Sequence, residues 1–156
     1  MGVSGSGKST IGKMLAGELH IPFFDGDDYH SKENVSKMQA GIPLDDSDRY
    51  VWLKKLNAIA QGYAKQNGCV IACSALKEAY RKILTEGLGH QAKWILLKGE
   101  YELIRERMKE RTSHFMPIEL LASQFDTLEI PSYSMKISID TTPELIVQHI
   151  LHELEY

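Results

Sequence analysis

Short apolar runs alternate along this chain with longer segments in which apolar residues recur every three or four positions. Apolar runs of four or five residues bounded by turn or charged residues are typical of buried strands, whereas a period near 3.6 is typical of amphipathic helices. The pattern predicts strands at residues 21–24, 69–73, 94–98 and 136–139. Because helical segments separate these strands, the order favours an α/β fold built on a parallel sheet.

Helical stripes fill the intervals between the strands. The first runs over residues 8–20, and the last begins near Pro143, a favourable residue for a first helical turn. Two others end at turn glycines, near Gly68 and at Gly87. The apolar faces consist of Ile11, Met14, Leu15 and Leu19; of Trp52, Leu56, Ile59 and Tyr63; of Leu76, Tyr80, Ile83 and Leu84; and of Ile146, Ile150 and Leu154.

Two polar stretches, at residues 27–49 and 105–126, do not fit this alternation. In a phosphoryl-transfer enzyme they would form an acceptor-binding flap at about 27–49 and a lid at about 107–126. The alternative is that both are ordinary solvated loops and helices. Since no linker or internal repeat is visible, we expect a single domain over residues 1–156.

The octapeptide GVSGSGKS at residues 2–9 fits the phosphate-loop pattern G-x-x-x-x-G-K-[ST]. Its glycines let backbone N–H groups surround phosphate oxygens, its lysine neutralises phosphate charge, and its last hydroxyl is available to Mg²⁺. The helix that follows points its positive end at the same anion. We therefore predict that the chain binds a nucleoside triphosphate. The expected contacts come from Gly2, Gly5, Ser6, Gly7, Lys8, Ser9 and Thr10.

An aspartate pair follows the predicted strand at 21–24, in the sequence Asp25-Gly26-Asp27. Ligands of an open parallel sheet bind at the carboxyl ends of its strands, so this pair should lie near the phosphate loop. We assign Asp27 as the base that takes the acceptor's hydroxyl proton, and Asp25 with Ser9 to the Mg²⁺ site. The alternative is an Asp-Gly turn in which Asp27 or Asp28 caps a helix.

Two arginines near the predicted lid are candidates for contact with the phosphates. Arg111 lies where a helix gives way to Thr112-Ser113, so that a lid motion could bring its guanidinium onto the transferring phosphoryl group. Arg107 lies one turn earlier on the same face. The alternative is that both are solvated charges paired with Glu106 or Glu110.

Composition narrows the classes of partner. The 156 residues include 18 Lys and Arg and 21 Asp and Glu, which gives a formal charge of −3. No basic run is present, so the composition argues against nucleic acid as a partner and favours small molecules.

No run of 18 apolar residues and no signal-peptide pattern occurs, so we expect a cytoplasmic protein without a membrane span. Cys69 and Cys73 are expected to be reduced core thiols, because no further cysteine completes a metal site.

Several blocks of the sequence carry a family resemblance. They are MGVSGSGKS at 1–9; Asp25-Gly26-Asp27 with His30, Asn34, Lys37-Met38, Gly41, Pro43-Leu44, Asp48-Arg49 and Trp52-Leu53; ACSALK at 72–77 with Tyr80-Arg81; and HFMP at 114–117 followed by Ser123-Gln124-Phe125 and Leu128-Glu129. In this order, and over nearly the whole chain, they resemble the gluconokinase family. Val51, in place of a usual Pro, and Ser113, in place of a usual Gly, depart from its pattern.

The resemblance implies a three-layer P-loop kinase fold similar to that of shikimate and nucleoside monophosphate kinases. It implies transfer of the ATP γ-phosphoryl group, with Mg²⁺, to the 6-hydroxyl of D-gluconate, giving 6-phosphogluconate and ADP. A pocket for this polyol monoanion should offer cations and polar donors. The resemblance also places Thr142 and Pro143 beside the adenine, and it leaves a homodimer open. The substrate residues carried over are Asp27, His30, Lys37, Arg49, Lys77 and Arg81.

The strand that feeds the phosphate loop is central in the related kinase fold, but here only residues 1–3 precede the body of the loop. Its loss would leave two neighbouring strands with unpaired backbone groups. Each such group costs about 1–3 kcal/mol, against a total stability of about 5–15 kcal/mol. We therefore expect a marginally stable chain, and we hypothesise that the natural protein starts upstream of Met1 with a short run rich in Val, Ile and Leu.

Three rival functions share the phosphate loop. A kinase for shikimate or a nucleoside monophosphate would look alike in fold, but the blocks at 30–49 and 74–81 argue against it. A regulatory GTPase would need the strings N-K-x-D and D-x-x-G, and neither occurs. A non-catalytic nucleotide sensor would have no use for the Asp27 carboxylate.

Overall fold

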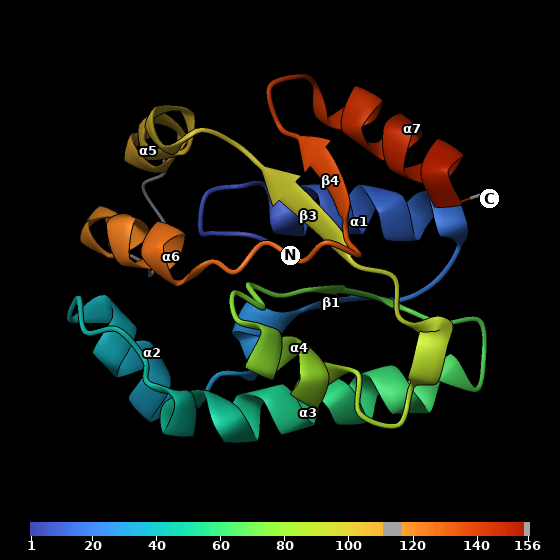
Figure 1. Cartoon of the computed structure of the whole chain (residues 1–156), viewed down its shortest axis with the longest axis horizontal. Coiled ribbons are helices and arrows are strands. Elements are labelled where there is room, and N and C mark those ends of the chain that lie inside the picture. Colours follow the sequence, from blue (N-terminus) through green and yellow to red (C-terminus); the bar gives the residue numbers. More distant parts are fainter. Residues whose placement is uncertain (111–116, 155–156) are drawn as a thin grey trace.

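Two pairs of short parallel strands form the middle layer of the protein (Figure 1). In the computed structural model, which describes residues 1–110 and 117–154, β1 (Phe23–Asp25) pairs with β2 (Val70–Ala72), and β3 (Ile95–Lys98) pairs with β4 (Met135–Ser138). All four predicted strands are confirmed, with bounds shifted by up to two residues.

Met1, Gly2 and Val3 lie between these two pairs. The Met1 ammonium donates to the carbonyl of Ile95 at 2.6 Å, and the N–H of Leu97 donates to the carbonyl of Met1 at 3.0 Å. On the other side, the Gly2 N–H donates to the carbonyl of Ser74 at 3.2 Å. The start of the chain therefore takes the place of the last residues of a central strand.

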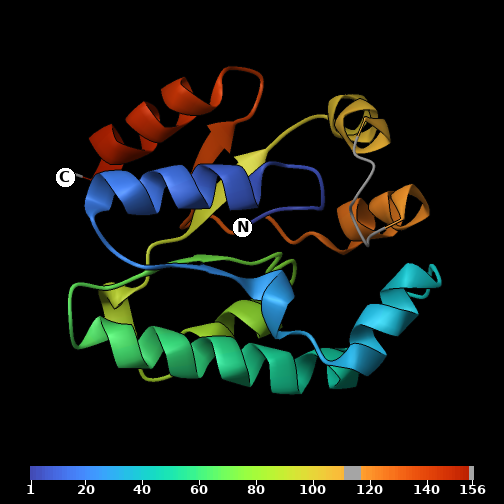
Figure 2. The same ribbon diagram turned by 180° about the vertical axis from the view of Figure 1, so that it is seen from behind.

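Different helices cover the two faces of the sheet (Figures 1 and 2). On one face, α1 (Lys8–Leu19) packs against α7 (Pro143–Leu154). On the other face, α3 (Asp46–Ala64) packs against α4 (Glu78–Leu84). The buried residues accordingly form two clusters, one around α1, β3, β4 and α7 and one around α3 and α4. This arrangement confirms the predicted three-layer α/β fold.

Three further helices gather at one end of the molecule, on the left in Figure 1 and on the right in Figure 2. They are α2 (Lys32–Gln39), α5 (Tyr101–Lys109) and α6 (Leu121–Thr127). Short 3-10 helices occupy Gly26–Tyr29, Gly89–Gln91 and Ile118–Leu120.

The polar stretch at 27–49 has more regular structure than its sequence predicts. Ser31 caps α2 by accepting from the N–H of Asn34, and Asp45 and Asp48 form a capping box at the start of α3. Within this stretch Asn34, Met38 and Leu44 are buried. The stretch therefore forms capped helices that pack in part against the body of the protein, and its role as an acceptor-binding flap stays a prediction.

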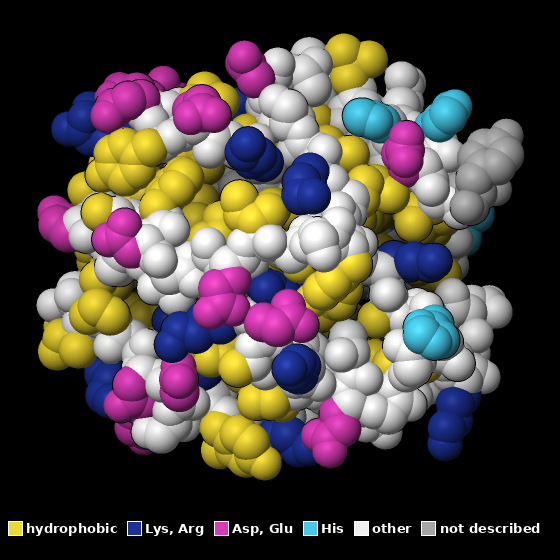
Figure 3. Space-filling model, viewed as in Figure 1, with side chains coloured by type: hydrophobic (Ala, Val, Ile, Leu, Met, Phe, Trp, Pro, Cys, Tyr) yellow, Lys and Arg dark blue, Asp and Glu magenta, His cyan; other side chains and the backbone are white. Residues whose placement is uncertain are grey.

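The surface and the cysteines agree with the composition. Acidic and basic side chains are interspersed on the face shown in Figure 3. None of the helices in the described parts of the chain is long and apolar enough to span a bilayer. Cys69 and Cys73 are free thiols, and burial raises the pKa of Cys73 to about 11, so it stays protonated.

Candidate active site

The phosphate loop turns into α1 as the motif requires. Gly5 and Gly7 have φ values of 79° and 90°, which residues with a side chain rarely adopt. Among the described residues no side chain caps α1, whose N-cap is Gly7, and the buried Ser6 hydroxyl has no hydrogen-bond partner. Unpartnered donors at a helix N-terminus form a site for an anion such as phosphate.

Lys8 folds back over this loop. Its ammonium donates to the carbonyl of Val3 at 2.8 Å, so the charge lies against the same backbone whose N–H groups would surround the phosphates. This is the place that the phosphate-loop motif assigns to its lysine.

Asp25 connects the phosphate loop to the end of β1. One of its carboxylate oxygens accepts a short hydrogen bond from the Ser9 hydroxyl, and the other accepts from the N–H of Asp27 at 3.1 Å. Two hard oxygen ligands thus lie together beside the loop, and Mg²⁺ prefers one or two such ligands together with phosphate oxygens and water. The residues therefore fit the predicted metal site.

Asp27 lies in the 3-10 helix Gly26–Tyr29, a short turn that directly follows Asp25. The turn is held by Trp52, whose indole N–H donates to the carbonyl of Gly26 at 2.6 Å. A side chain at Gly26 would approach the carbonyl of Ala72 to 2.7 Å, so glycine is needed for this close packing. The residue that caps this turn is Asp25, and neither Asp27 nor Asp28 is its N-cap.

His30 lies against the same tryptophan, with ring centroids 4.2 Å apart and an interplanar angle of 17°. Burial, and then the nearby charge of Arg49, lower the pKa of His30 to about 4. The imidazole is thus neutral at pH 7. Its buried Nδ1 has no hydrogen-bond partner among the described residues, so it is available to a ligand hydroxyl.

A cavity of about 500 Å³ lies between the start of α3, the β2–α4 connection and α6. Its polar lining includes Asp46, Arg49, Lys77, Tyr80, Ser123 and Gln124. Two cations and several hydroxyl or amide groups are the lining that a polyol anion requires. Of the predicted substrate residues, Arg49 and Lys77 line this cavity.

Arg49 presents its guanidinium over the Tyr80 ring, with its Cζ 5.4 Å from the ring centroid. Its buried Nε has no hydrogen-bond partner within the described residues. A buried guanidinium N–H without a partner is costly, and a ligand carboxylate would satisfy it.

Asp46 lies one helical turn before Arg49 on α3 and binds two other residues that line the cavity. Its Oδ1 accepts from the Tyr80 hydroxyl at 2.5 Å and from the Lys77 ammonium at 2.9 Å. These two hydrogen bonds, that of Tyr80 above all, keep the pKa of Asp46 below its usual value. Besides its two cations, the cavity therefore contains a negative group that can accept hydrogen bonds from ligand hydroxyls.

Two predicted substrate residues are held elsewhere by the protein. Lys37 forms an ion pair with Asp48, at 2.7 Å, which ties α2 to α3, and it does not line the cavity. Arg81 is 2% exposed and donates to the carbonyl of Ala75 at 2.7 Å and to the Glu78 carboxylate at 3.0 Å. The charged groups of both residues are thus bound within the fold in this structure, and their contact with a substrate stays a prediction.

Gln124 was not predicted as a site residue, although its block forms part of the family resemblance. Its Oε1 accepts from the N–H of Ser4 in the phosphate loop at 2.6 Å, in a buried position, and the residue also lines the acceptor cavity. This contact is what brings the cavity next to the phosphate loop. A glutamine between Ser and Phe gives no sign of such a contact from local sequence alone.

The predicted nucleotide contacts of the lid and the last helix lie near one another. Arg107 donates to the carbonyl of Ile139 at 2.8 Å, three residues before Thr142 and the start of α7 at Pro143. Thr10 is exposed in the first turn of α1. Arg111 lies outside the described residues, and its role stays a prediction.

Comparison with known sequences identifies relatives of this chain. Residues 4–155 match the family model for shikimate kinase. The thermosensitive gluconokinase of Escherichia coli K12 is 49% identical over 132 residues, covering 84% of this chain and 70% of that protein. The probable gluconokinase of Rattus norvegicus is 43% identical over 176 residues, covering 99% of this chain and 95% of that protein. The gluconokinase of Arabidopsis thaliana is 42% identical over 166 residues, covering 97% of this chain and 88% of that protein.

Solved structures extend the likeness to three dimensions. An unliganded sugar kinase from Janibacter sp. HTCC2649 superposes with a TM-score of 0.91 at 42% identity, covering 99% of this chain and 91% of that one. A gluconokinase from Sinorhizobium meliloti 1021 superposes with a TM-score of 0.87 at 40% identity, with 99% and 89% coverage. A Mycobacterium tuberculosis APS kinase, 17% identical with a TM-score of 0.73, shares the fold.

Proposed function

Because the chain belongs to the gluconokinase family, we propose that it transfers the γ-phosphoryl group of ATP to the 6-hydroxyl of D-gluconate, giving 6-phosphogluconate and ADP. The observation that carries this proposal is the cavity of about 500 Å³ lined by Arg49 and Lys77, which Gln124 joins to the phosphate loop. A phosphoryl donor site and a pocket with cations for a small anion thus lie side by side.

The donor phosphates would bind the first-turn N–H groups of α1, the Ser6 hydroxyl and the Lys8 ammonium. These groups are in place before a ligand arrives, since the loop glycines fix the backbone and Lys8 lies against Val3. Preorganised donors stabilise the charge that develops on the transferring group at little reorganisation cost. The Ser9 hydroxyl and the Asp25 carboxylate would hold Mg²⁺, which neutralises charge on the β- and γ-phosphates when bound.

Asp27 would accept the proton of the attacking hydroxyl. It lies two residues beyond the Asp25 carboxylate, in the turn anchored by Trp52. A carboxylate held at the carboxyl end of a parallel strand, beside the phosphate loop, is suited to act as general base toward a bound alcohol.

The acceptor's carboxylate would bind to Arg49 and Lys77, and its hydroxyls to the neutral His30 imidazole and the Asp46 carboxylate. Arg49 offers an unpartnered buried N–H, and Asp46 holds Lys77 at the cavity wall. Positive and negative groups together in one cavity would select a ligand that carries one anionic end and a row of hydroxyls. On the nucleotide side, Arg107, Thr142 and Pro143 would border the adenine, and Arg111 would reach the phosphates from the lid.

A coupled assay of ADP formation tests the proposal. The acceptors are gluconate, other sugar acids, shikimate and AMP, each with ATP and Mg²⁺, and gluconate should give the highest kcat/KM. Removal of Mg²⁺ with EDTA should abolish the rate, and added Mg²⁺ should restore it. A higher kcat/KM with shikimate or AMP would refute the proposed acceptor.

Because the reaction consumes ATP, we also propose that the protein acts in the cytoplasm.

A further inference from the structure

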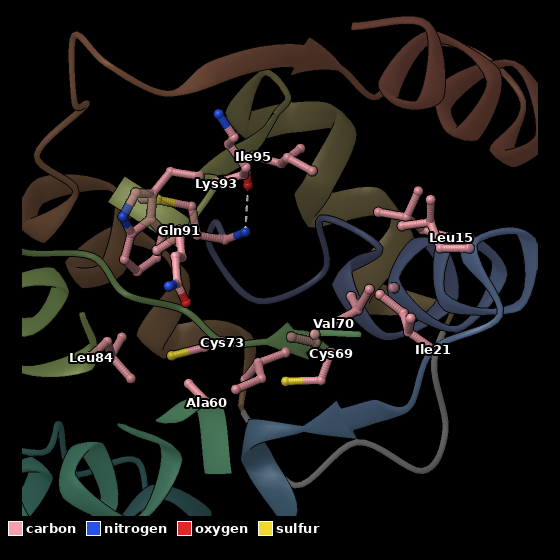
Figure 4. Close-up of a pocket in the computed structure, with 18 of the residues that line it drawn as sticks. Leu15, Ile21, Ala60, Cys69, Val70, Cys73, Leu84, Gln91, Lys93 and Ile95 are labelled. Atoms are coloured by element: carbon pink, nitrogen blue, oxygen red, sulfur yellow. Dashed lines mark hydrogen bonds between the residues drawn. The ribbon is translucent and has the colours of Figure 1, made fainter. Parts of the chain in front are cut away.

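Residues 73–77 connect β2 to α4 and carry Leu76 and Lys77 to the acceptor cavity. At the start of this acceptor segment, Cys73 lines a second, largely apolar cavity of about 610 Å³ together with Leu84 of α4 (Figure 4). Apolar contacts are not directional, so they do not fix the backbone conformation of the segment. The direction in which the segment presents Lys77 therefore depends on its hydrogen bonds.

Ala75, in the middle of the acceptor segment, has a backbone conformation that residues with a side chain rarely adopt. Its φ is 46°, and the residue is fully buried. In the described part of the chain one other non-glycine residue, His20, has a positive φ, and it ends α1, where this conformation is common. A strained residue persists only where its surroundings hold it, and such residues cluster at functional sites. The contacts that hold Ala75 thus bear on the position of Lys77.

Arg81 holds the acceptor segment from the helix that follows it. Its guanidinium donates to the carbonyl of Ala75 at 2.7 Å and to that of Leu76 at 3.2 Å. Its other donors bind the Glu78 carboxylate, at 3.0 and 3.1 Å. Because the guanidinium is buried, these hydrogen bonds are stronger than they would be in water. Arg81 therefore fixes the two carbonyls that precede Lys77.

The connection between α6 and β4 passes the same segment and binds it from a distant part of the sequence (Figure 1). The Glu129 N–H donates to the carbonyl of Leu76 at 2.8 Å, and the Glu129 carboxylate accepts from the N–H of Glu78 at 2.6 Å. The Tyr133 hydroxyl accepts from the Arg81 Nε at 3.1 Å and donates to the Glu78 carboxylate at 2.7 Å. The hydrogen bond from Tyr133, more than those from Arg81, keeps the pKa of Glu78 below its usual value.

These contacts join two elements that both line the acceptor cavity. The segment contributes Leu76 and Lys77, and α6 contributes Ser123 and Gln124. Glu129 follows the end of α6 by two residues, so its hydrogen bonds tie the end of this helix to the segment. A change in the connection would thus alter the acceptor cavity before it altered the phosphate loop.

We propose that Glu129 and Tyr133 are positioning residues of the acceptor site, which hold the strained segment so that it presents Lys77 to the acceptor. The inference rests on the proposed function for the identity of that acceptor. Without these contacts Ala75 would leave its strained conformation in a fraction of the molecules. The apparent affinity for the acceptor would fall in proportion to the fraction that keeps it.

Tyr133→Phe tests the proposal with little risk to the fold, because Tyr133 is 54% exposed and loses only its hydroxyl. The KM for gluconate should rise about three- to tenfold, while the KM for ATP stays within about twofold. Tm should change by only a few degrees. The matched control is Tyr63→Phe in α3, which should change neither KM. The Tyr63 ring packs against Phe24, and its hydroxyl has no hydrogen-bond partner within the described ranges.

Two further variants separate the contributions. Glu129→Ala should raise the KM for gluconate, and Glu129→Gln, which keeps an acceptor oxygen for the Glu78 N–H, should raise it less. Ala75→Gly, added to Tyr133→Phe, should lower the KM for gluconate by at least about twofold, because glycine adopts a positive φ without strain. A KM that stayed at the Tyr133→Phe value would overturn the role given to the strain.

Amide hydrogen exchange without substrate gives a second measurement that does not depend on activity. The amides of Glu78 and Glu129 should exchange at least about threefold faster in Tyr133→Phe than in the parent chain. Unchanged exchange at both amides, an unchanged KM for gluconate, or an equal rise in both KM values would overturn the proposal. A parent chain that did not phosphorylate gluconate would refute the proposed function instead, and the exchange rates would still decide whether Tyr133 holds the segment.

Discussion

Replacement of Arg49 by lysine tests the assignment of the acceptor's carboxylate most directly. The Arg49 guanidinium lines the acceptor cavity, lies over Tyr80, and has a buried Nε without a partner among the described residues. Lysine keeps the charge but cannot donate two parallel hydrogen bonds to a carboxylate. Loss of one charge-assisted hydrogen bond costs about 1.5–3 kcal/mol, which corresponds to roughly 10- to 150-fold weaker binding.

The assay measures initial rates of ADP formation while either gluconate or ATP is varied and the other is saturating. For Arg49→Lys, the KM for gluconate should rise roughly 10- to 150-fold, and the KM for ATP should stay within about twofold. The matched control is Arg105→Lys on α5. The Arg105 side chain is 43% exposed and pairs with Glu102, so this change should alter neither KM. Thermal unfolding of both variants establishes that they are folded.

An equal rise in both KM values would place Arg49 at the nucleotide or in the general support of the site. An unchanged KM for gluconate would refute the carboxylate contact itself. Either result would leave Lys77 as the remaining cation of the cavity and would require a different orientation of the acceptor.

Four further predictions concern the phosphate loop and the flap. Lys8→Ala should lower kcat by at least about 10²-fold, because it removes a preorganised charge at the phosphates, and near-normal turnover in the ADP assay would contradict the mechanism. Asp27→Asn should lower kcat roughly 10²-fold or more while Tm changes by only a few degrees, and a collapse of Tm with normal activity per folded molecule would point to a structural role. Gln124→Leu leaves the buried N–H of Ser4 unpaired, which costs about 1–3 kcal/mol of stability and should lower Tm by about 2–12 °C. Gln124→Glu keeps the acceptor oxygen, so its Tm should fall by less. The pKa of His30 is lowered in the folded protein, so the unfolded state binds a proton at this residue first as the pH falls from 6.5 to 4. The free energy of unfolding should therefore fall over this interval, and it should fall by more in the parent chain than in the His30→Gln variant.

The sheet could be predicted because its strands carry local signals. Each of the four is a short apolar run bounded by turn or charged residues, and the structure keeps all four within two residues of the predicted bounds. Helix α2 was missed, because only Asn34 and Met38 of its eight residues are buried, and so few apolar positions leave no helical stripe. Its local signal was the Ser31 cap rather than hydrophobicity.

The placement of the candidate site's residues follows from the sequence where backbone motifs define it, and does not where the direction of a side chain decides it. The phosphate loop, Asp25 and Asp27 follow from strand ends and glycines. Arg81, in contrast, turns inward to the carbonyl of Ala75, a residue with φ of 46° whose conformation this hydrogen bond helps to fix. Nothing in a Tyr-Arg pair reveals whether an arginine faces the ligand or the backbone behind it.

The first three residues link the candidate active site to the sheet. Met1 and Gly2 bond to β3 and to the end of β2, Val3 is buried in the core, and the loop that surrounds the phosphates begins directly after them. Ser4 is then held by Gln124 from α6, and Lys8 by the carbonyl of Val3. The position of the phosphate loop therefore depends on a short stretch that is anchored on both of its sides, to β3 and to the connection that follows β2.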